Sequence, residues 1–522
     1  MSKLEESNSF ILESLNLLKE PIATCLKASF FEYVEFYAPH IATCLLYDSI
    51  IDLCLADTLS HLATFVIGVT YLSSYDMEKF KVLSTFIGFS ILIIYVCRLC
   101  ENVIKYYFWM FLYIAIILGS ATYFSNNSEI SFYQLEKPAH RQMLLIASMN
   151  FMAYTFNVVY HPLRPGFISY FSLHFLGYMF NPVNVLNGPW LGLNIYDRCF
   201  QNKKRTVFNA GEMWNTWRVR VILQFSLQSF CFYVLGKCIL QMIIEKNNNL
   251  WILIFCKCLQ YRCMHYAHCH MSSAALTCAG HHVFFGNLRY PIAHASRIEF
   301  PVSMANALVC YERQFKSFIE QYFTNRFSYM QSIYPRSDLA TLPLIYILMC
   351  FDQFSSLIAI LTLFIFVHMQ SNCQGAISDA FNICVRRYPC MYLYCPHKYK
   401  STHPITIGCK LIFMILNLIM INYITIAIID EDYKQIWKDM HYVGHHICML
   451  YFLLGMITVN LHPQILYLNR RSPIALEVMV SSSSNKEMVT KFTQTDDQTH
   501  LVPSDSLETL HNKKNLKLKK KR

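Results

Sequence analysis

The sequence is a succession of long apolar runs, and this pattern restricts its fold more than any other feature. A helix needs about 20 mostly apolar residues to cross a membrane, and runs near that length recur along most of the chain. Some of these runs can be re-entrant or interfacial, so we predict about nine to eleven transmembrane helices. The candidate runs are 35–55, 59–75, 82–98, 104–123, 143–161, 166–186, 219–243, 250–286, 301–324, 339–368, 405–429 and 445–468.

The composition agrees with a bilayer environment. Hydrophobic residues make up 54% of the chain and charged residues only 15%, whereas about a quarter of the residues in a soluble domain are charged. The chain has a net charge of +11 but no motif that recognises nucleic-acid bases, so we expect no nucleic-acid partner. We therefore predict an all-α fold, a polytopic membrane helix bundle.

Three regions are expected. Residues 1–28 form an amphipathic N-terminal segment, residues 29–469 the multi-span membrane domain, and residues 470–522 a disordered basic tail. The tail carries 11 Lys or Arg against 6 Asp or Glu, and basic segments beside membrane spans stay in the cytosol. Its end, Lys519-Lys520-Lys521-Arg522, resembles the dilysine signal of the endoplasmic reticulum; a generic basic tail is the alternative.

Other basic residues indicate how the chain is oriented in the membrane. The segments 203–205 and 386–400 are rich in Lys and Arg and are expected to face the cytosol. No basic segment followed by an apolar core precedes the first run, which we therefore expect to be an uncleaved signal anchor. For most of the lone basic residues in apolar runs we expect snorkelling to an interface. These residues are Lys237, Lys257, Arg262 and Lys410.

The 21 cysteines lie mostly singly in apolar runs without regular spacing. We interpret them as small buried hydrophobic side chains rather than as a disulfide framework. His265 and Cys269 are four residues apart and would share a helical face, as zinc ligands often do. Because no further ligands clearly converge on this pair, we expect polar packing there and no metal site.

One apolar run is interrupted by polar residues near its centre. The run 339–368 contains Asp352-Gln353-Phe354-Ser355-Ser356. Ionisable groups at bilayer depth are costly and mark functional sites. The cluster predicts a water-lined or protein-buried site at the membrane midplane. A loop joining two helices is the alternative interpretation.

Five motifs then occur in order along the chain. They are Gln142-Met143, Phe175-Leu176-Gly177-Tyr178, Gly188-Pro189-Trp190, Tyr261-Arg262-Cys263-Met264-His265-Tyr266 and Glu299-Phe300-Pro301-Val302-Ser303-Met304. Together with a late span bearing His445-His446, they resemble the Porcupine branch of the membrane-bound O-acyltransferase family. The resemblance covers roughly residues 137–465.

The resemblance implies a multi-pass helix bundle of the endoplasmic reticulum membrane with an internal tunnel. It implies transfer of palmitoleoyl from palmitoleoyl-CoA, a long-chain acyl-CoA, to a serine of a Wnt-type secreted protein, which promotes Wnt secretion and signalling. The acyl-CoA is a co-substrate and no cofactor stays bound. Membrane lipid is a further partner, and an acyl chain needs a dry groove that ends in a few polar groups.

The chain departs from the family at positions assigned to catalysis. The family's histidine corresponds to Asp352-Gln353, its Trp-Asn pair to Tyr311-Glu312, and later asparagines to Glu320-Gln321. Removing the serine proton is general-base work. A solvated aspartate is a poor base, and a desolvated one is stronger.

Roles are carried over by position. Asp352 is expected to face the thioester, with Glu312, Glu320 and Gln321 as orienting or oxyanion neighbours. Trp190, Gln353 and Ser355 are expected to line the acyl-donor site. Two alternatives stay open, a catalytically silent Wnt- or lipid-binding homologue and a membrane transporter, although no symmetric pair of broken helices supports the latter.

Overall fold

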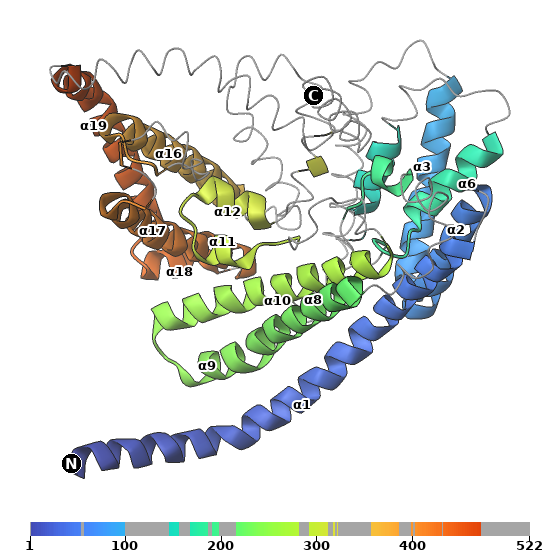
Figure 1. Cartoon of the computed structure of the whole chain (residues 1–522), viewed down its shortest axis with the longest axis horizontal. Helices are drawn as coiled ribbons and strands as arrows, with labels where there is room; N and C mark the ends of the chain where they lie inside the picture. The colour runs from blue at the N-terminus through green and yellow to red at the C-terminus, as the bar shows by residue number, and fades with distance from the viewer. Residues whose placement is uncertain are drawn as a thin grey trace, which may run out of the picture. The chain divides into compact units, whose positions relative to one another are not determined.

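The structure is a computed structural model of the whole chain (Figure 1). Within the residues that it describes, every regular element is a helix and no strand occurs. The prediction of an all-α protein is confirmed, whereas the predicted number of spans and the tunnel remain predictions. The described residues are 2–53, 57–99, 143, 146–155, 168–185, 190–197, 216–280, 292–311, 317–318, 321, 357–385, 398–399, 402–430 and 432–470.

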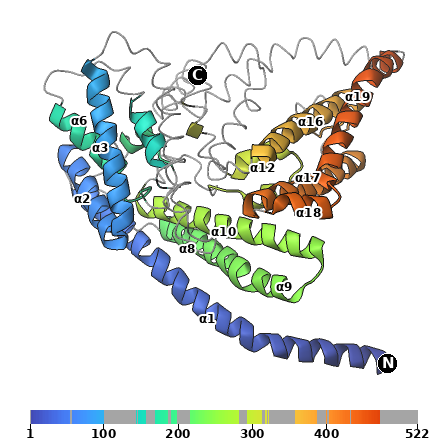
Figure 2. The ribbon, with the colours of Figure 1, turned by 180° about the vertical axis from the view of Figure 1, so that it is seen from behind.

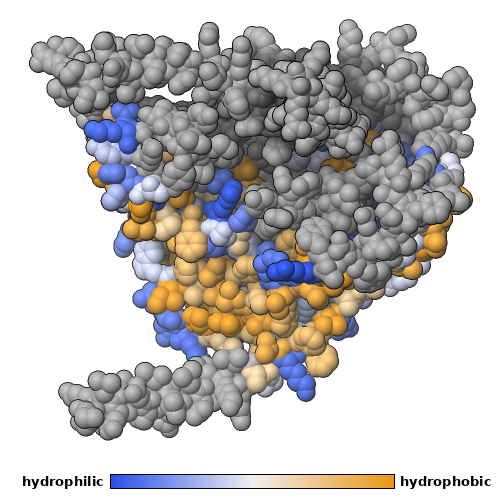
Figure 3. Space-filling model, in the orientation of Figure 1, coloured by the Kyte–Doolittle hydropathy of each residue, from blue (hydrophilic) through white to orange (hydrophobic). Residues whose placement is uncertain are grey.

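Three helical stretches among these residues are long and apolar enough to cross a membrane: Arg218–Lys246, Pro404–Ala427 and Val443–Asn460. Each one falls on a run predicted from the sequence. Several outward-facing side chains on the first stretch are apolar, with Leu223 and Leu227 63% and 64% exposed. Figure 3 shows apolar side chains gathered over this part of the surface. Such a surface is suited to lipid, so the chain is an all-α membrane protein.

The first of these stretches is one arm of a helical hairpin. It consists of α8 (Thr216–Val234), the π-helical turn η2 (Leu235–Leu240) and α9 (Gln241–Lys246). After a three-residue turn, α10 (Leu250–Cys278) packs back against it. The carboxamide oxygen of Asn249 caps α10 by accepting the backbone N–H groups of the second and third residues after it.

The long helix α1 (Ser2–Leu53) packs along this hairpin, as Figures 1 and 2 both show. Aromatic rings fill the contact: Tyr33 lies 5.3 Å from Phe230 and 5.5 Å from Tyr233, between ring centroids. One disulfide, Cys25–Cys238, joins α1 to η2. Nine of the twelve free cysteines that the structure describes are buried, in agreement with the sequence, but the sequence analysis did not predict the disulfide.

In a second group of helices, α2 (Asp57–Tyr75) and α6 (Ile168–Met179) pack against each other through glycines. The group also contains α3 (Met77–Leu99). Gly68 of α2 lies directly against the backbone that follows α6, and Gly177 of α6 lies against the backbone of α2. Because a side chain at either position would meet main-chain atoms, the two helices approach closely only with glycine there.

The remaining helices are α11 (Ala295–Glu299), α12 (Met304–Tyr311), α16 (Leu357–Phe381), α17 (Pro404–Ile429), α18 (Tyr433–Asp439) and α19 (Val443–Arg470). The chain divides into two compact units, residues 1–371 with 410–450 and residues 372–409 with 451–522. In the second unit, backbone hydrogen bonds join Tyr399 to Asn382 and Cys384. The contacts that form the candidate site belong to the first unit.

Candidate functional site

The predicted site residues are described only in part. Trp190 and Gln321 are among the described residues. The other five, Asp352, Gln353, Ser355, Glu312 and Glu320, lie outside them. The candidate site is therefore built from the residues that surround Trp190 and from the helices that carry the other matched motifs.

Three hydrogen bonds hold the segment that begins at Trp190. The phenol of Tyr178, on α6, donates to the carbonyl of Leu191 over 2.6 Å. Farther along, the Tyr196 hydroxyl lies 2.9 Å from His61 Nδ1 of α2, and Asp197 pairs with a histidine of α6. Since both helices are packed rigidly through their glycines, this segment is positioned by the scaffold.

Trp190 itself is buried, with 4% of its surface exposed. Its ring meets the ring of Phe318 edge to face, with centroids 5.1 Å apart. A methyl group built on Gly192 would lie 3.3 Å from the Trp190 ring and 3.5 Å from Gln321 Oε1. The structure thus places Trp190 and Gln321, two of the predicted site residues, beside the same glycine. An aromatic wall with one carboxamide near it suits an apolar ligand that has a polar end.

A buried ion pair joins two of the matched motifs. Arg262 of α10 is 1% exposed and donates to both carboxylate oxygens of Glu299, from Nε over 2.8 Å and from Nη2 over 3.0 Å. Tyr266, one turn later, donates to the same carboxylate over 2.7 Å. Arg262 Nη1 donates to the side-chain oxygen of Asn422, on α17, over 2.8 Å. Arg262 is therefore buried in a polar network rather than snorkelling to an interface.

The next residues of α10 reach the end of α12. The ring of His265 stacks on the ring of Tyr311, with centroids 4.0 Å apart and planes 6° apart. His265 Nε2–H donates to the Tyr311 carbonyl over 3.1 Å, and the Cys269 sulfur lies 3.4 Å from the same nitrogen. His265 and Cys269 share a helical face, as their spacing indicates. No group of metal-ligating side chains forms among the described residues.

A histidine–carboxylate pair that was not predicted from the sequence lies next to the Trp190 segment. His174 of α6 donates from Nε2 to Asp197 over 2.7 Å, and its Nδ1 lies 3.2 Å from the hydroxyl of Tyr154. The His61 ring packs edge-on against His174, with centroids 4.6 Å apart. Both nitrogens of His174 are engaged, so the pair positions the segment. The 23 residues that separate His174 from Asp197 hide this pairing in the sequence.

Three pairs of sequence segments are thus in contact: α6 with the Trp190 segment, α10 with α11, and α10 with the end of α12. No protein-family model and no curated protein matches the chain.

Proposed function

We propose that this chain is a Porcupine-like protein-serine O-palmitoleoyltransferase, which acylates Wnt-type proteins in the membrane of the endoplasmic reticulum. The observation that carries the proposal is the mutual contact of motifs that the sequence separates. Tyr178 of one motif holds Leu191, directly after the Gly-Pro-Trp motif. Arg262 of another motif is paired with Glu299, which opens the Glu-Phe-Pro-Val-Ser-Met motif.

These contacts support the proposal because the resemblance rests on the order of the motifs along the chain and not on contacts between them. Charged and polar side chains are costly to bury unless they are paired, so these contacts fix the motif segments against one another. The proximity of Trp190 and Gln321 at Gly192 adds an apolar wall and a polar group at one place. An acyl chain that ends in a thioester needs both.

The proposed reaction is an acyl transfer from sulfur to oxygen. The acceptor serine Oγ attacks the thioester carbonyl, and a base takes the hydroxyl proton as the C–O bond forms. The C–S bond then breaks, and the coenzyme A thiolate leaves and takes up a proton. We assign the base to Asp352, at the position of the family's histidine. A general base of this kind contributes about 10²–10⁴-fold to the rate.

The test uses the purified full chain in lipid nanodiscs with palmitoleoyl-CoA and a Wnt-derived peptide, and detects acyl-serine by mass spectrometry. We expect acylated peptide from the wild type and none from a peptide with alanine in place of serine. Asp352→Asn is expected to lower the rate by about 10²–10⁴-fold. Gln435→Ala, an exposed position on α18, is the matched control and should leave the rate unchanged.

The absence of a histidine at position 352 favours a second candidate, a catalytically silent Wnt- or lipid-binding homologue. The same preparation separates the two functions. Retention of labelled palmitoleoyl-CoA without any acyl-serine product supports the silent binder and contradicts the enzyme. Product that persists undiminished in Asp352→Asn contradicts our choice of base but not the acyl transfer.

A further inference from the structure

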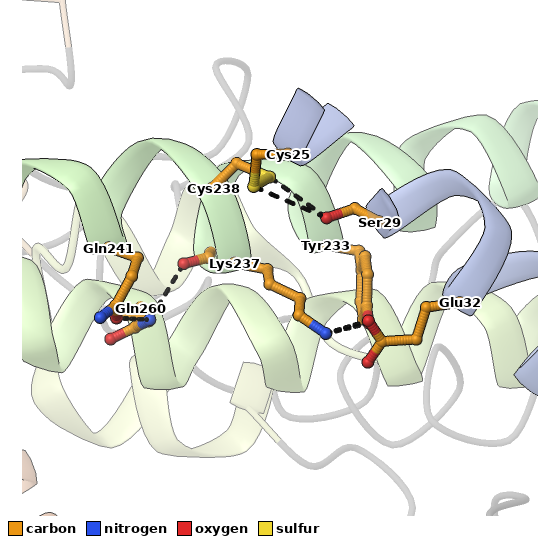
Figure 4. Close-up of a disulfide and its surroundings, with 9 residues drawn as sticks. Cys25, Ser29, Glu32, Tyr233, Lys237, Cys238, Gln241 and Gln260 are labelled. Atoms are coloured by element: carbon orange, nitrogen blue, oxygen red, sulfur yellow. Dashed lines mark hydrogen bonds and ion pairs between the residues drawn. A yellow bond between two sulfur atoms is a disulfide. The ribbon is translucent and has the colours of Figure 1, made fainter. Parts of the chain in front are cut away.

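The contact between α1 and η2 combines a covalent bond with an ion pair (Figure 4). Cys25 and Cys238 form a disulfide, with their Cα atoms 5.9 Å apart. The next residue toward the N-terminus of η2, Lys237, pairs with Glu32 of α1. Ser29, one turn after Cys25, places its hydroxyl 3.1 Å from the Cys238 sulfur. This end of the helix pair is therefore polar and cross-linked.

Other charges lie at the same level along the hairpin. Cys238 is eight residues before the end of α9, and Lys257 is seven residues after the start of α10. At 1.5 Å per residue, these positions lie about 12 Å and about 10 Å from the connecting turn. Lys257 pairs with Asp430, just after α17, over 3.8 Å, and both side chains are partly exposed. Paired, half-exposed charges at one level are typical of a membrane–water interface.

The opposite end of the same helices carries another ion pair. Arg218, at the start of α8, donates to Asp48 of α1 over 2.6 Å, and its Nε donates to the carbonyl of Thr277 at the end of α10 over 3.0 Å. The 20 residues from Arg218 to Cys238 extend about 30 Å, and the 23 residues from Cys25 to Asp48 extend about 35 Å. A bilayer has a hydrocarbon core about 30 Å thick, so the two ion pairs mark its two surfaces.

The two surfaces can be assigned to compartments by two separate arguments. Disulfides form and persist in oxidising, non-cytosolic compartments, which places the Cys238 end outside the cytosol. The basic segment Lys203-Lys204-Arg205 precedes α8 by ten residues, 206–215, too few to cross a membrane as a helix. From the sequence we therefore assign it to the same side of the membrane as Arg218, and such segments stay in the cytosol. Both arguments give the same orientation.

We infer that the Cys238 end of the hairpin lies on the non-cytosolic side of the membrane together with the N-terminal part of α1, which the Cys25–Cys238 disulfide fastens to it. The bond forms by thiol–disulfide exchange with an oxidised protein disulfide of that compartment. The thiolate of Cys25 attacks this disulfide, and that of Cys238 then displaces the partner from the mixed disulfide. The partner leaves as a dithiol that carries the two electrons and two protons.

The covalent part is tested with a protease site inserted after Arg205. Membranes are treated with an alkylating reagent before lysis, cleaved, and run on a gel without reductant. We expect the two wild-type fragments to migrate together, and to separate with reductant or in Cys25→Ser or Cys238→Ser. Cys231→Ser is the matched control because Cys231 is a free, exposed thiol on α8, the helix that leads into η2; its fragments should stay joined. Wild-type fragments that separate without reductant would overturn the disulfide.

The orientation is tested with an N-glycosylation acceptor tag placed either at the N-terminus or after Arg205. Only a tag on the non-cytosolic side receives a glycan, which a glycosidase-sensitive mass shift detects. We expect glycosylation of the N-terminal tag alone, also in the double variant Cys25→Ser/Cys238→Ser. Glycosylation of the tag after Arg205, or an unmodified N-terminal tag, would overturn the orientation. Neither experiment depends on acyl transfer.

Discussion

At the scale of single residues, Arg262 shows how this chain buries a charge. Its guanidinium is satisfied by both carboxylate oxygens of Glu299 and by the carboxamide of Asn422. A buried ion can be stable only when its partners replace the lost water, and removing one partner leaves the other charge uncompensated. The side chain therefore ties α10 to α11 and α17 rather than serving as a surface charge.

We expect Arg262→Met to destabilise the protein by about 3–5 kcal/mol, the range for breaking a buried ion pair. Because the Glu299 side chain is 21% exposed, we expect a loss of stability near the lower end of that range. The loss of stability in the double variant Arg262→Met/Glu299→Gln should be smaller than the sum of the losses in the two single variants. Thermal unfolding in one fixed detergent measures all three.

The matched control is Lys257→Met, since the Lys257–Asp430 pair is 38% and 27% exposed at its side chains. Exposed ion pairs contribute about 0–1 kcal/mol, so this variant should unfold close to the wild type. If the losses of stability in the two single variants simply add up in the double variant Arg262→Met/Glu299→Gln, the two side chains do not act as a unit.

At the scale of elements, the packing of α2 against α6 depends on the absence of side chains. Gly177 brings α6 against α2 so closely that an added methyl group would lie 2.7 Å from the Tyr196 hydroxyl and 2.8 Å from the His61 carbonyl. The same two residues, His61 and Tyr196, hydrogen-bond to each other and hold the segment that starts at Trp190. The close contact between α2 and α6 therefore also positions the candidate site.

Gly177→Ala is expected to destabilise the protein by about 1–3 kcal/mol because the extra methyl overpacks the contact, and to reduce acyl transfer by displacing Trp190. Gly88→Ala on α3 is the matched control, since nothing lies within 4 Å of a methyl built there. Relative to glycine, alanine favours a helix interior by up to about 1 kcal/mol. In thermal unfolding we expect Gly177→Ala to lower the stability and Gly88→Ala to raise it. An equal loss of stability in both variants would contradict the close approach of α6 to α2.

At the scale of the whole molecule, the bilayer is the solvent for much of the surface. Each of the membrane-crossing helices carries exposed apolar side chains, including Leu227 on α8. Leu227 is nine residues, about 14 Å, from Arg218, and therefore close to the middle of a 30 Å core. A protein with this surface is stable only where lipid or detergent covers it.

We expect Leu227→Arg to lower membrane insertion, because a charged side chain at the centre of a spanning helix costs about 2.5–3.5 kcal/mol on the translocon scale. The measurement is the fraction of newly made chain that resists extraction at alkaline pH. Leu227→Ala is the control for the lost side chain and should insert almost normally. Insertion of the arginine variant at the wild-type level would mean that this face does not meet lipid.

The helical class, and the position of the three apolar stretches long enough to cross a membrane among the described residues, could be predicted from local sequence alone. The predicted runs 219–243, 405–429 and 445–468 overlap the three apolar stretches of the structure, because the length and hydrophobicity of a spanning segment are local properties. Helix periodicity likewise predicted that His265 and Cys269 share a face. Local spacing was sufficient in each of these cases.

Which helix faces contact each other is visible only in the folded chain. Glu299 is 37 residues from Arg262, and Cys238 is 213 residues from Cys25, so neither pairing is a periodic signal. The approach of Trp190 to Gln321 depends on Gly192 and on how α2 and α6 hold that segment. Hydrophobic patterning specifies which side of a helix is buried, but the partner is selected by packing among all the helices at once, and no local stretch of sequence contains that information.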